Sequence, residues 1–180
     1  DGVPSRGMPA FPLPEADLGA LTLLVRSLSA PASENHPAGD VAAGERYFFG
    51  NGGCASCHMV MGRGKAAGPD LSSVGREMTY VELEEAVRQP AAKIRPGYQM
   101  ASVTLQNGRT LRGFARNQSR YNLQLQDMGG TFHLLRAEEI KTTRLEPGSV
   151  MAPSKCSVAE CRDLLAFLSG LTGAGAVKPA

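Results

Sequence analysis

Apolar residues recur at helical spacing near both ends of the chain, and this pattern predicts two amphipathic helices. In residues 15–29, leucine and valine return every three or four positions, so one face of the predicted helix is apolar. Residues 158–170 repeat the pattern, and Ser157 stands in the position of an N-cap. We expect the apolar face of this second helix to be buried.

Capping signals predict two shorter helices between the predicted helices at the two ends of the chain. Asp40 is a suitable N-cap for a helix over residues 41–49, and the glycines directly after that stretch end it. Thr79 and Glu82 form a capping box, which predicts a helix over residues 80–89. A proline follows and stops this helix.

After Pro96-Gly97 the pattern changes to an alternation of apolar and polar residues. The alternation continues to residue 145 and is interrupted by turn sequences such as Asn107-Gly108. It predicts four or five short antiparallel strands. The chain is therefore predicted to be mainly helical with a small inserted antiparallel β-sheet or barrel, which makes it α+β overall.

Composition adds limits to this picture. A chain of 180 residues is long enough for one domain with a sizeable core, and a net charge of +2 with 42% hydrophobic residues is typical of a globular protein. No apolar run reaches the roughly 18 residues that a membrane span needs. Lysine and arginine are scattered, aromatic residues make up only 6% and tryptophan is absent, so we expect no nucleic-acid binding.

The candidate chemistry is concentrated in Cys54-Ala-Ser-Cys57-His58. Two thiols at this spacing can each form a thioether with a vinyl group of one haem, and the adjacent histidine then ligates the iron. A thioredoxin-like disulfide would need a strand before the motif and a helix after it, whereas glycine-rich segments flank it here. A zinc site would need a second pair of soft ligands, and the spacing of Cys156 and Cys161 fits that role poorly. We therefore expect covalently bound haem c, with its iron.

The sequence around this motif, GDVAAGERYFFGNGGCASCH, resembles the first helix and haem-attachment turn of class I c-type cytochromes. The resemblance implies that Gly44 and Phe48 pack against the last helix of the domain, where Leu164 and Phe167 are the opposing contacts. A glycine at such a crossing lets two helix backbones approach closely.

Gly68-Pro69-Asp70-Leu71 also matches this family. Here the resemblance implies that the Pro69 carbonyl accepts a hydrogen bond from the second ring nitrogen of His58. Such a contact fixes the tautomer of the ring and makes the imidazole a better iron donor.

A methionine is the expected second axial ligand, as is usual in cytochromes of this class. The chain resembles a bacterial haem-binding-domain family of large periplasmic dehydrogenase-like proteins, in which a small β unit interrupts the cytochrome before the methionine loop. This resemblance favours Met151, although one extra alanine separates it from the following proline. Met100 and Met8 also lie in sequences typical of ligand loops and stay open as alternatives, whereas His36 and His133 are weaker ones.

The predicted organisation follows from these assignments. Residues 1–30 hold a loop and a helix that resemble the end of an upstream cytochrome domain, so the chain is either a fragment of a longer protein or a single domain with an added helix. The remaining segments are a linker (31–39), the first part of a class I cytochrome c domain (40–97), the β insert (98–146), the methionine loop with the last helix (147–171) and a loose tail (172–180).

A haem with histidine and methionine ligands has no open position, which suits the transfer of single electrons. We therefore expect an electron carrier rather than an enzyme, with a dehydrogenase or another cytochrome as redox partner. The alternative is a haem enzyme or gas sensor with an open distal position. Covalent haem indicates the periplasm or another oxidising compartment, where Cys156 and Cys161 are expected to form a disulfide. The β insert resembles Sm or SH3 barrels only at the level of fold and is interpreted as a docking surface or a cover for the haem edge.

Overall fold

The computed structural model describes residues 7, 9–10, 12–35 and 37–173. The chain divides into two compact units, Asp1–Ala30 and Pro31–Ala180. None of the helices in the described part of the chain is long and apolar enough to cross a membrane.

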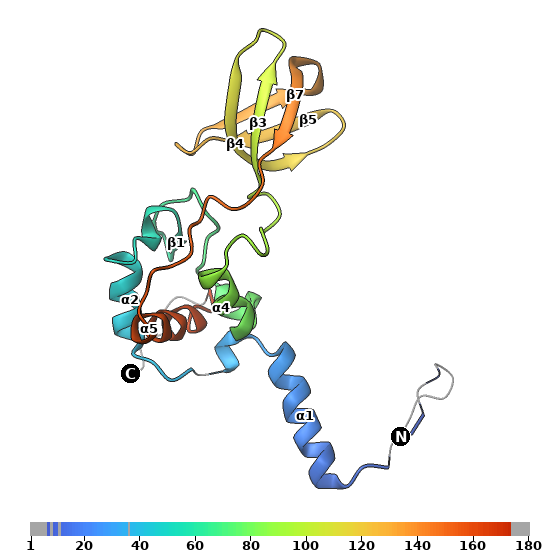
Figure 1. Ribbon diagram of the computed structural model, residues 1–180, viewed down its shortest axis with the longest axis vertical. Helices are drawn as coiled ribbons and strands as arrows, with labels where there is room; N and C mark the ends of the chain where they lie inside the picture. The colour runs from blue at the N-terminus through green and yellow to red at the C-terminus, as the bar shows by residue number, and fades with distance from the viewer. Residues whose placement is uncertain (1–6, 8, 11, 36, 174–180) are drawn as a thin grey trace. The chain divides into compact units, whose positions relative to one another are not determined.

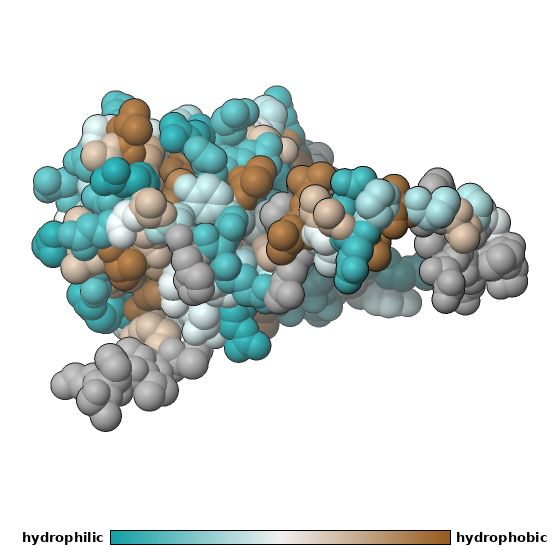
Figure 2. Space-filling model, turned by 90° about the horizontal axis from the view of Figure 1, so that it is seen from below, coloured by the Kyte–Doolittle hydropathy of each residue, from teal (hydrophilic) through white to brown (hydrophobic). Residues whose placement is uncertain are grey.

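The first unit contains α1 (Glu15–Ser29), with the bounds that the sequence predicts. Acidic residues in its first turn, Glu15 and Asp17, lie at the positive end of the helix dipole and stabilise it. Several apolar side chains along α1 are exposed, among them Leu18 and Leu23. Figure 2 shows apolar side chains in brown on the surface of this helix.

The second unit has a helical half whose helices begin where the sequence provides a cap. The Asp40 carboxylate accepts a hydrogen bond from the N–H of Ala43 at 3.0 Å, and Thr79 and Ser157 each open a capping box. The three helices predicted for this half are confirmed, and one short helix was not predicted. The helices are α2 (Val41–Phe49), α3 (Val74–Glu77), α4 (Tyr80–Arg88) and α5 (Val158–Ser169).

The helical core is built around the contact of α2 with α5 (Figure 1). Gly44 lies at the crossing, where an added Cβ would overlap the carbonyl oxygen of Asp163. Phe48 fills the adjacent space, with its ring centroid 5.7 Å from that of Phe167. The close approach of first and last helix that the family resemblance implied is therefore confirmed, with buried Leu164 in the same cluster.

Residues 54–71, a glycine-rich stretch for which no regular element was predicted, hold short regular elements. They contain the 3-10 helix η3 (Cys54–Ser56) and a small hairpin of β1 (Met59–Val60) and β2 (Arg63–Gly64). Elements of two or three residues leave no periodic pattern, so the sequence could not indicate them.

The predicted linker over residues 31–39 is also more ordered than its composition suggested. It contains the 3-10 helix η2 (Ala32–Glu34), and Ala32 is fully buried in the helical core. The N–H of Ala32 donates to the Met78 carbonyl at 2.8 Å. This stretch is therefore part of the second unit.

The alternating segment forms a five-stranded antiparallel sheet in the order β6-β5-β4-β3-β7. Its alternate residues build a second core, in which Ala101, Val103 and Leu125 are fully buried. The prediction of four or five strands is confirmed, but a sheet of this size makes the fold mixed, so the description "mainly helical" is not. The strands are β3 (Met100–Leu105), β4 (Thr110–Gln118), β5 (Asn122–Gln126), β6 (Phe132–Arg136) and β7 (Ile140–Leu145), with η4 (Ala137–Glu139) between the last two.

The chain enters and leaves the sheet at the same end, because the first strand, β3, and the last strand, β7, are antiparallel neighbours. Ala101 of β3 pairs with Leu145 of β7, and the N–H of Glu146 donates to the Met100 carbonyl at 2.8 Å. The segment before β3 and the methionine loop after β7 therefore start from the same end of the sheet. Such an insertion leaves the contact of α2 with α5 intact.

Candidate haem site

The haem-attachment motif begins just after α2 in a tight turn. Gly53 has a φ of 65°, a left-handed conformation that glycine adopts without strain. The turn continues in η3, and the N–H of His58 donates to the Cys54 carbonyl at 2.9 Å. Cys54 is half-buried and Cys57 is exposed, and both thiols are free. One short segment thus presents two thiols and an imidazole.

His58 is oriented by a hydrogen bond from its ring to the backbone. Its Nδ1 lies 2.9 Å from the carbonyl oxygen of Pro69. Because a carbonyl oxygen only accepts, Nδ1 donates and Nε2 keeps its lone pair. Burial lowers the pKa of His58, against a smaller opposite effect of the Pro69 hydrogen bond. The ring is therefore neutral near pH 7, which is the form that ligates a metal.

Two glycines make room for this histidine. A Cβ at Gly68 would lie 2.8 Å from Cε1 and 2.9 Å from Nδ1 of the His58 ring. A Cβ at Gly64 would overlap the His58 carbonyl oxygen, and the φ of 102° at this position also favours glycine. The sequence pointed to the segment that begins at Gly68 but assigned neither glycine this close contact with His58.

Arg63 joins the hairpin to α2 and was not singled out from the sequence. Its guanidinium lies 3.9 Å from the ring centroid of Phe49, and its Nη1 lies 2.7 Å from a carboxylate oxygen of Glu45. The N–H of Lys65 donates to the Ala55 carbonyl at 3.1 Å. These contacts hold the hairpin against the motif, and no sequence pattern marks them because they join separate elements.

The residues of the motif fit haem c better than zinc. Burial raises the pKa of the Cys54 thiol, whereas zinc binds thiolates. Cys156 and Cys161, the second pair that zinc would need, are bonded to each other. Within residues 37–173 and the other described positions, no group of three or more His, Cys, Asp or Glu side chains could hold a metal ion. Free thiols beside a fixed histidine are what covalent haem attachment requires.

Residues 41–128 match the family model described as Cytochrome c. The matched stretch is just under half of the chain and is similar to cytochrome c domains. This family binds haem c with its iron, and it is typically made up of electron carriers. The match begins with α2, includes Cys54 to His58 and Pro69, and ends near the end of β5. It stops before Met151 and α5, so it leaves the second axial ligand open.

Other comparisons add little to this assignment. A search of curated proteins gave no match. A crystal structure of the pleiotropic translational regulator Hfq matches 37% of this chain and 88% of its own chain at 20% identity, with a TM-score of 0.26. A TM-score this low carries no weight for fold or function.

Met151 lies on the loop between the sheet and α5. Its side chain is 38% exposed and lines a groove of about 440 Å³ together with residues 88–92, at and after the end of α4. The N–H of Ser154 donates to the Val87 carbonyl at 3.0 Å, which fixes the loop to α4.

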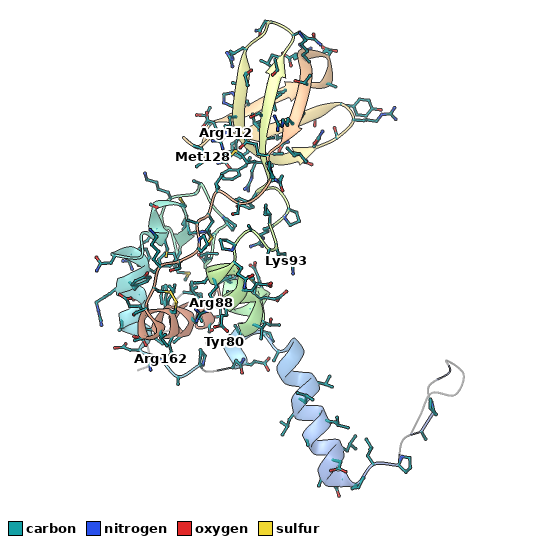
Figure 3. All side chains as sticks on the ribbon, in the orientation of Figure 1. Tyr80, Arg88, Lys93, Arg112, Met128 and Arg162 are labelled. Carbon is teal, nitrogen blue, oxygen red and sulfur yellow. A yellow bond between two sulfur atoms is a disulfide. The ribbon has the colours of Figure 1, made fainter. Side chains whose placement is uncertain are left out.

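Cys156 and Cys161 form the expected disulfide, with their Cα atoms 5.2 Å apart. Figure 3 shows it as a yellow bond beside α5. It ties the end of the methionine loop to the first turn of α5, where Cys161 is buried.

The alternative ligands lie in different surroundings. Met100 is the first residue of β3 and is 2% exposed. His133 has its Nε2 3.0 Å from a carboxylate oxygen of Asp127 at the β5–β6 turn. Met8 and His36 lie outside the described residues, as does most of the predicted tail.

Proposed function

We propose that this domain transfers single electrons through one haem c, attached at Cys54 and Cys57 and ligated by His58 and Met151. The observation that carries the proposal is the pair of free thiols beside a histidine whose Nδ1 is fixed by the Pro69 carbonyl. When bound, the haem supplies a one-electron redox centre, and a methionine ligand raises its potential. His58 and Met151 together would leave a bound haem no free iron position for a substrate.

The choice of Met151 over Met100 is supported by the state of the two side chains. Met151 is partly exposed on a loop, so its thioether is available to a ligand without loss of packing. Met100 is buried in the sheet, and withdrawing a buried methionine from its packing costs about 2–5 kcal/mol. The order of the elements also favours Met151, since its loop leads directly into α5.

We further propose that the chain works in the periplasm, or in another oxidising compartment, within a larger redox protein. The Cys156–Cys161 disulfide supports this location, because disulfides persist where thiols are not kept reduced. A single-electron carrier needs an electron donor and an electron acceptor. A dehydrogenase and a second cytochrome are the kinds of partner that fill these roles.

The test compares Met151→Ala with Met100→Leu in protein that carries covalent haem. We expect oxidised wild-type protein to be low-spin and to show the sulfur-to-iron charge-transfer band. Met151→Ala should lose the band and Met100→Leu should keep it. Loss of the band only in Met100→Leu would move the ligand to Met100. A high-spin wild-type haem that binds carbon monoxide readily would instead favour the enzyme or gas sensor.

A further inference from the structure

Strand β6 forms an open edge of the five-stranded sheet. In the order β6-β5-β4-β3-β7, it pairs with β5 and has no other neighbour among the described strands. Phe132 and Leu134 are 52% and 72% exposed, and they lie on one face of β6 because side chains alternate along a strand. Proteins that stay monomeric usually protect such an edge with charges, prolines or a covering segment. The apolar β6 edge therefore has the properties of an interaction surface.

The backbone of β6 also has groups that point away from the sheet. In an antiparallel ladder, hydrogen-bonded residue pairs alternate with pairs that are not hydrogen-bonded. The N–H of Asp127 donates to the Thr131 carbonyl at 3.0 Å, and the β5–β6 register continues from there without a shift. At the other end of β6, the N–H of Ala137 donates to the Tyr121 carbonyl at 2.8 Å. The odd-numbered residues of β6 therefore bond to β5, and the even-numbered ones direct their N–H and C=O groups outward.

One of these outward N–H groups already has a partner. The N–H of Arg136 donates to a carboxylate oxygen of Glu139 at 2.8 Å, as expected for a group that points away from β5. Phe132 and Leu134 have no such partner among the described residues. Each of these two residues thus offers one donor and one acceptor to an added strand.

The charged side chains of β6 are paired within the chain. Arg136 forms ion pairs with Glu138 at 3.0 Å and with Glu139 at 3.3 Å. The Nε2 of His133 lies 3.0 Å from a carboxylate oxygen of Asp127. Two β6 edges can therefore approach each other without bringing unpaired like charges from this strand together.

The opposite edge of the sheet, β7, has a different character. It carries Lys141 and Arg144, and both side chains are exposed. Two β7 edges side by side would bring positive charges together, which disfavours their pairing. Charges of this kind protect an edge strand from association. The contrast identifies β6 as the edge that is open to pairing.

We propose that two copies of this chain associate by antiparallel pairing of their β6 strands. The partner is a second copy because β6 is complementary to itself in its free backbone groups, its apolar side chains and its paired charges. The contact has twofold symmetry, so it uses the same residues on both sides and closes at a dimer. It gives the β insert a role in assembly that does not depend on the haem.

The free backbone groups select one register for this pairing. When Phe132 of one copy lies opposite Leu134 of the other, the free donors and acceptors of both copies form four hydrogen bonds. The N–H of Arg136 then keeps its bond to Glu139. Each phenylalanine also faces a leucine across the contact, and apolar cross-strand pairs of this kind stabilise a sheet.

The first test is analytical ultracentrifugation of the full chain from about 1 μM to about 1 mM, the range of weak association. The wild type should pass reversibly from monomer to dimer as the concentration rises. Leu134→Pro removes the outward N–H of this residue and leaves the hydrogen bonds to β5 in place. Two hydrogen bonds are lost per dimer, so the dissociation constant should rise about tenfold or more.

Leu145→Pro is the matched control on the other edge of the sheet. Leu145 is also an exposed leucine of an edge strand. The N–H of Glu146 donates to the Met100 carbonyl, so the neighbouring N–H of Leu145 points away from β3. This variant should form dimers as the wild type does.

Four outcomes of this experiment would overturn the proposal. The wild type could stay monomeric over the whole range, or it could grow beyond a dimer, which would indicate head-to-tail pairing of β6 with β7. Leu134→Pro could dimerise as well as the wild type. Both proline variants could lose dimerisation equally, which would place the contact away from β6.

A second measurement needs no variant and covers the case in which Leu134→Pro fails to fold. Hydrogen exchange of individual amides is followed in the wild type at the two ends of the concentration range. The N–H groups of Phe132 and Leu134 should exchange more slowly at the high concentration, whereas that of Leu145 should not change. Equal exchange of Phe132 and Leu134 at both concentrations would overturn the pairing of β6.

Discussion

The two sides of the proposed iron site are built in different ways. His58 is fixed by residues close to it in sequence: its ring donates to the Pro69 carbonyl at 2.9 Å, and Gly68 makes room for it. Met151 lies on a loop that is joined to distant elements, through Ser154 to Val87 of α4 and through a disulfide to α5.

The difference shows that short-range contacts orient one residue of the site, whereas long-range contacts position the other. A ligand fixed by its own turn keeps its geometry even when the rest of the domain varies, since few contacts are needed to form it. A ligand on a loop that follows an inserted sheet depends on the sheet, on α4 and on the disulfide. We therefore expect changes near His58 to affect haem attachment and changes near Met151 to affect ligation and stability.

The largest expected effect is the loss of covalent haem in the double variant Cys54→Ala and Cys57→Ala. Without the two thiols no thioether can form, so haem should be extracted completely by acid and organic solvent. The mass of the intact protein measures this directly. The double variant Cys156→Ser and Cys161→Ser is the control and should keep its haem. Covalent haem in the first variant would contradict the assignment of the motif.

The second effect concerns the Met151 side and its disulfide. Removal of Cys156 and Cys161 by the double serine variant should lower the free energy of unfolding by about 2–4 kcal/mol, because the unfolded chain gains freedom. It should also weaken the sulfur-to-iron charge-transfer band, since the methionine loop loses its attachment to α5. Urea unfolding and the oxidised spectrum measure the two effects. The interpretation fails if the band is unchanged while stability falls.

A smaller effect is expected from Gly68→Ala on the His58 side. The added Cβ would lie 2.8 Å from Cε1 of the His58 ring, and strain of this kind costs about 1–3 kcal/mol. The ring should shift away from Pro69, which changes the ferric spectrum and lowers the unfolding midpoint. Gly19→Ala is a suitable control because nothing lies within 4 Å of its added Cβ. Equal stability of Gly68→Ala and the wild type would show that the turn has more room than the structure indicates.

The smallest effect is a dependence of stability on acid pH at the end of the sheet from which the Met151 loop departs. Hydrogen bonds from Arg112 and Ser102 lower the pKa of Glu146 to about 2. The stabilisation is present above the ordinary carboxyl pKa of 4.5 and is lost as the pH falls towards 2. Thermal unfolding of Glu146→Gln should be less sensitive to pH between these values than that of the wild type. Glu138→Gln is the control. If the pH dependence of thermal unfolding changes equally in both variants, the Arg112–Glu146 pair is not its cause.

Much of the helical half could be predicted because its signals are local. The caps at Asp40, Thr79 and Ser157 marked helix starts, and alternation marked the sheet. The short helix α3 and the burial of Ala32 could not be predicted, since both depend on contacts with residues far along the chain. The hairpin β1–β2 could not be predicted because its two-residue strands leave no periodic pattern.

By itself, the sequence determined the spacing of the two thiols and the imidazole on which the proposed haem site rests, and the alternation that becomes a sheet. Five adjacent residues are enough for the first, since the chemistry of two thiols and an imidazole depends on spacing alone. Only the tertiary structure decided that β3 and β7 are neighbours and that Met100 is buried while Met151 is exposed. These properties arise from pairings between residues tens of positions apart, and a linear pattern carries no record of which distant segments meet.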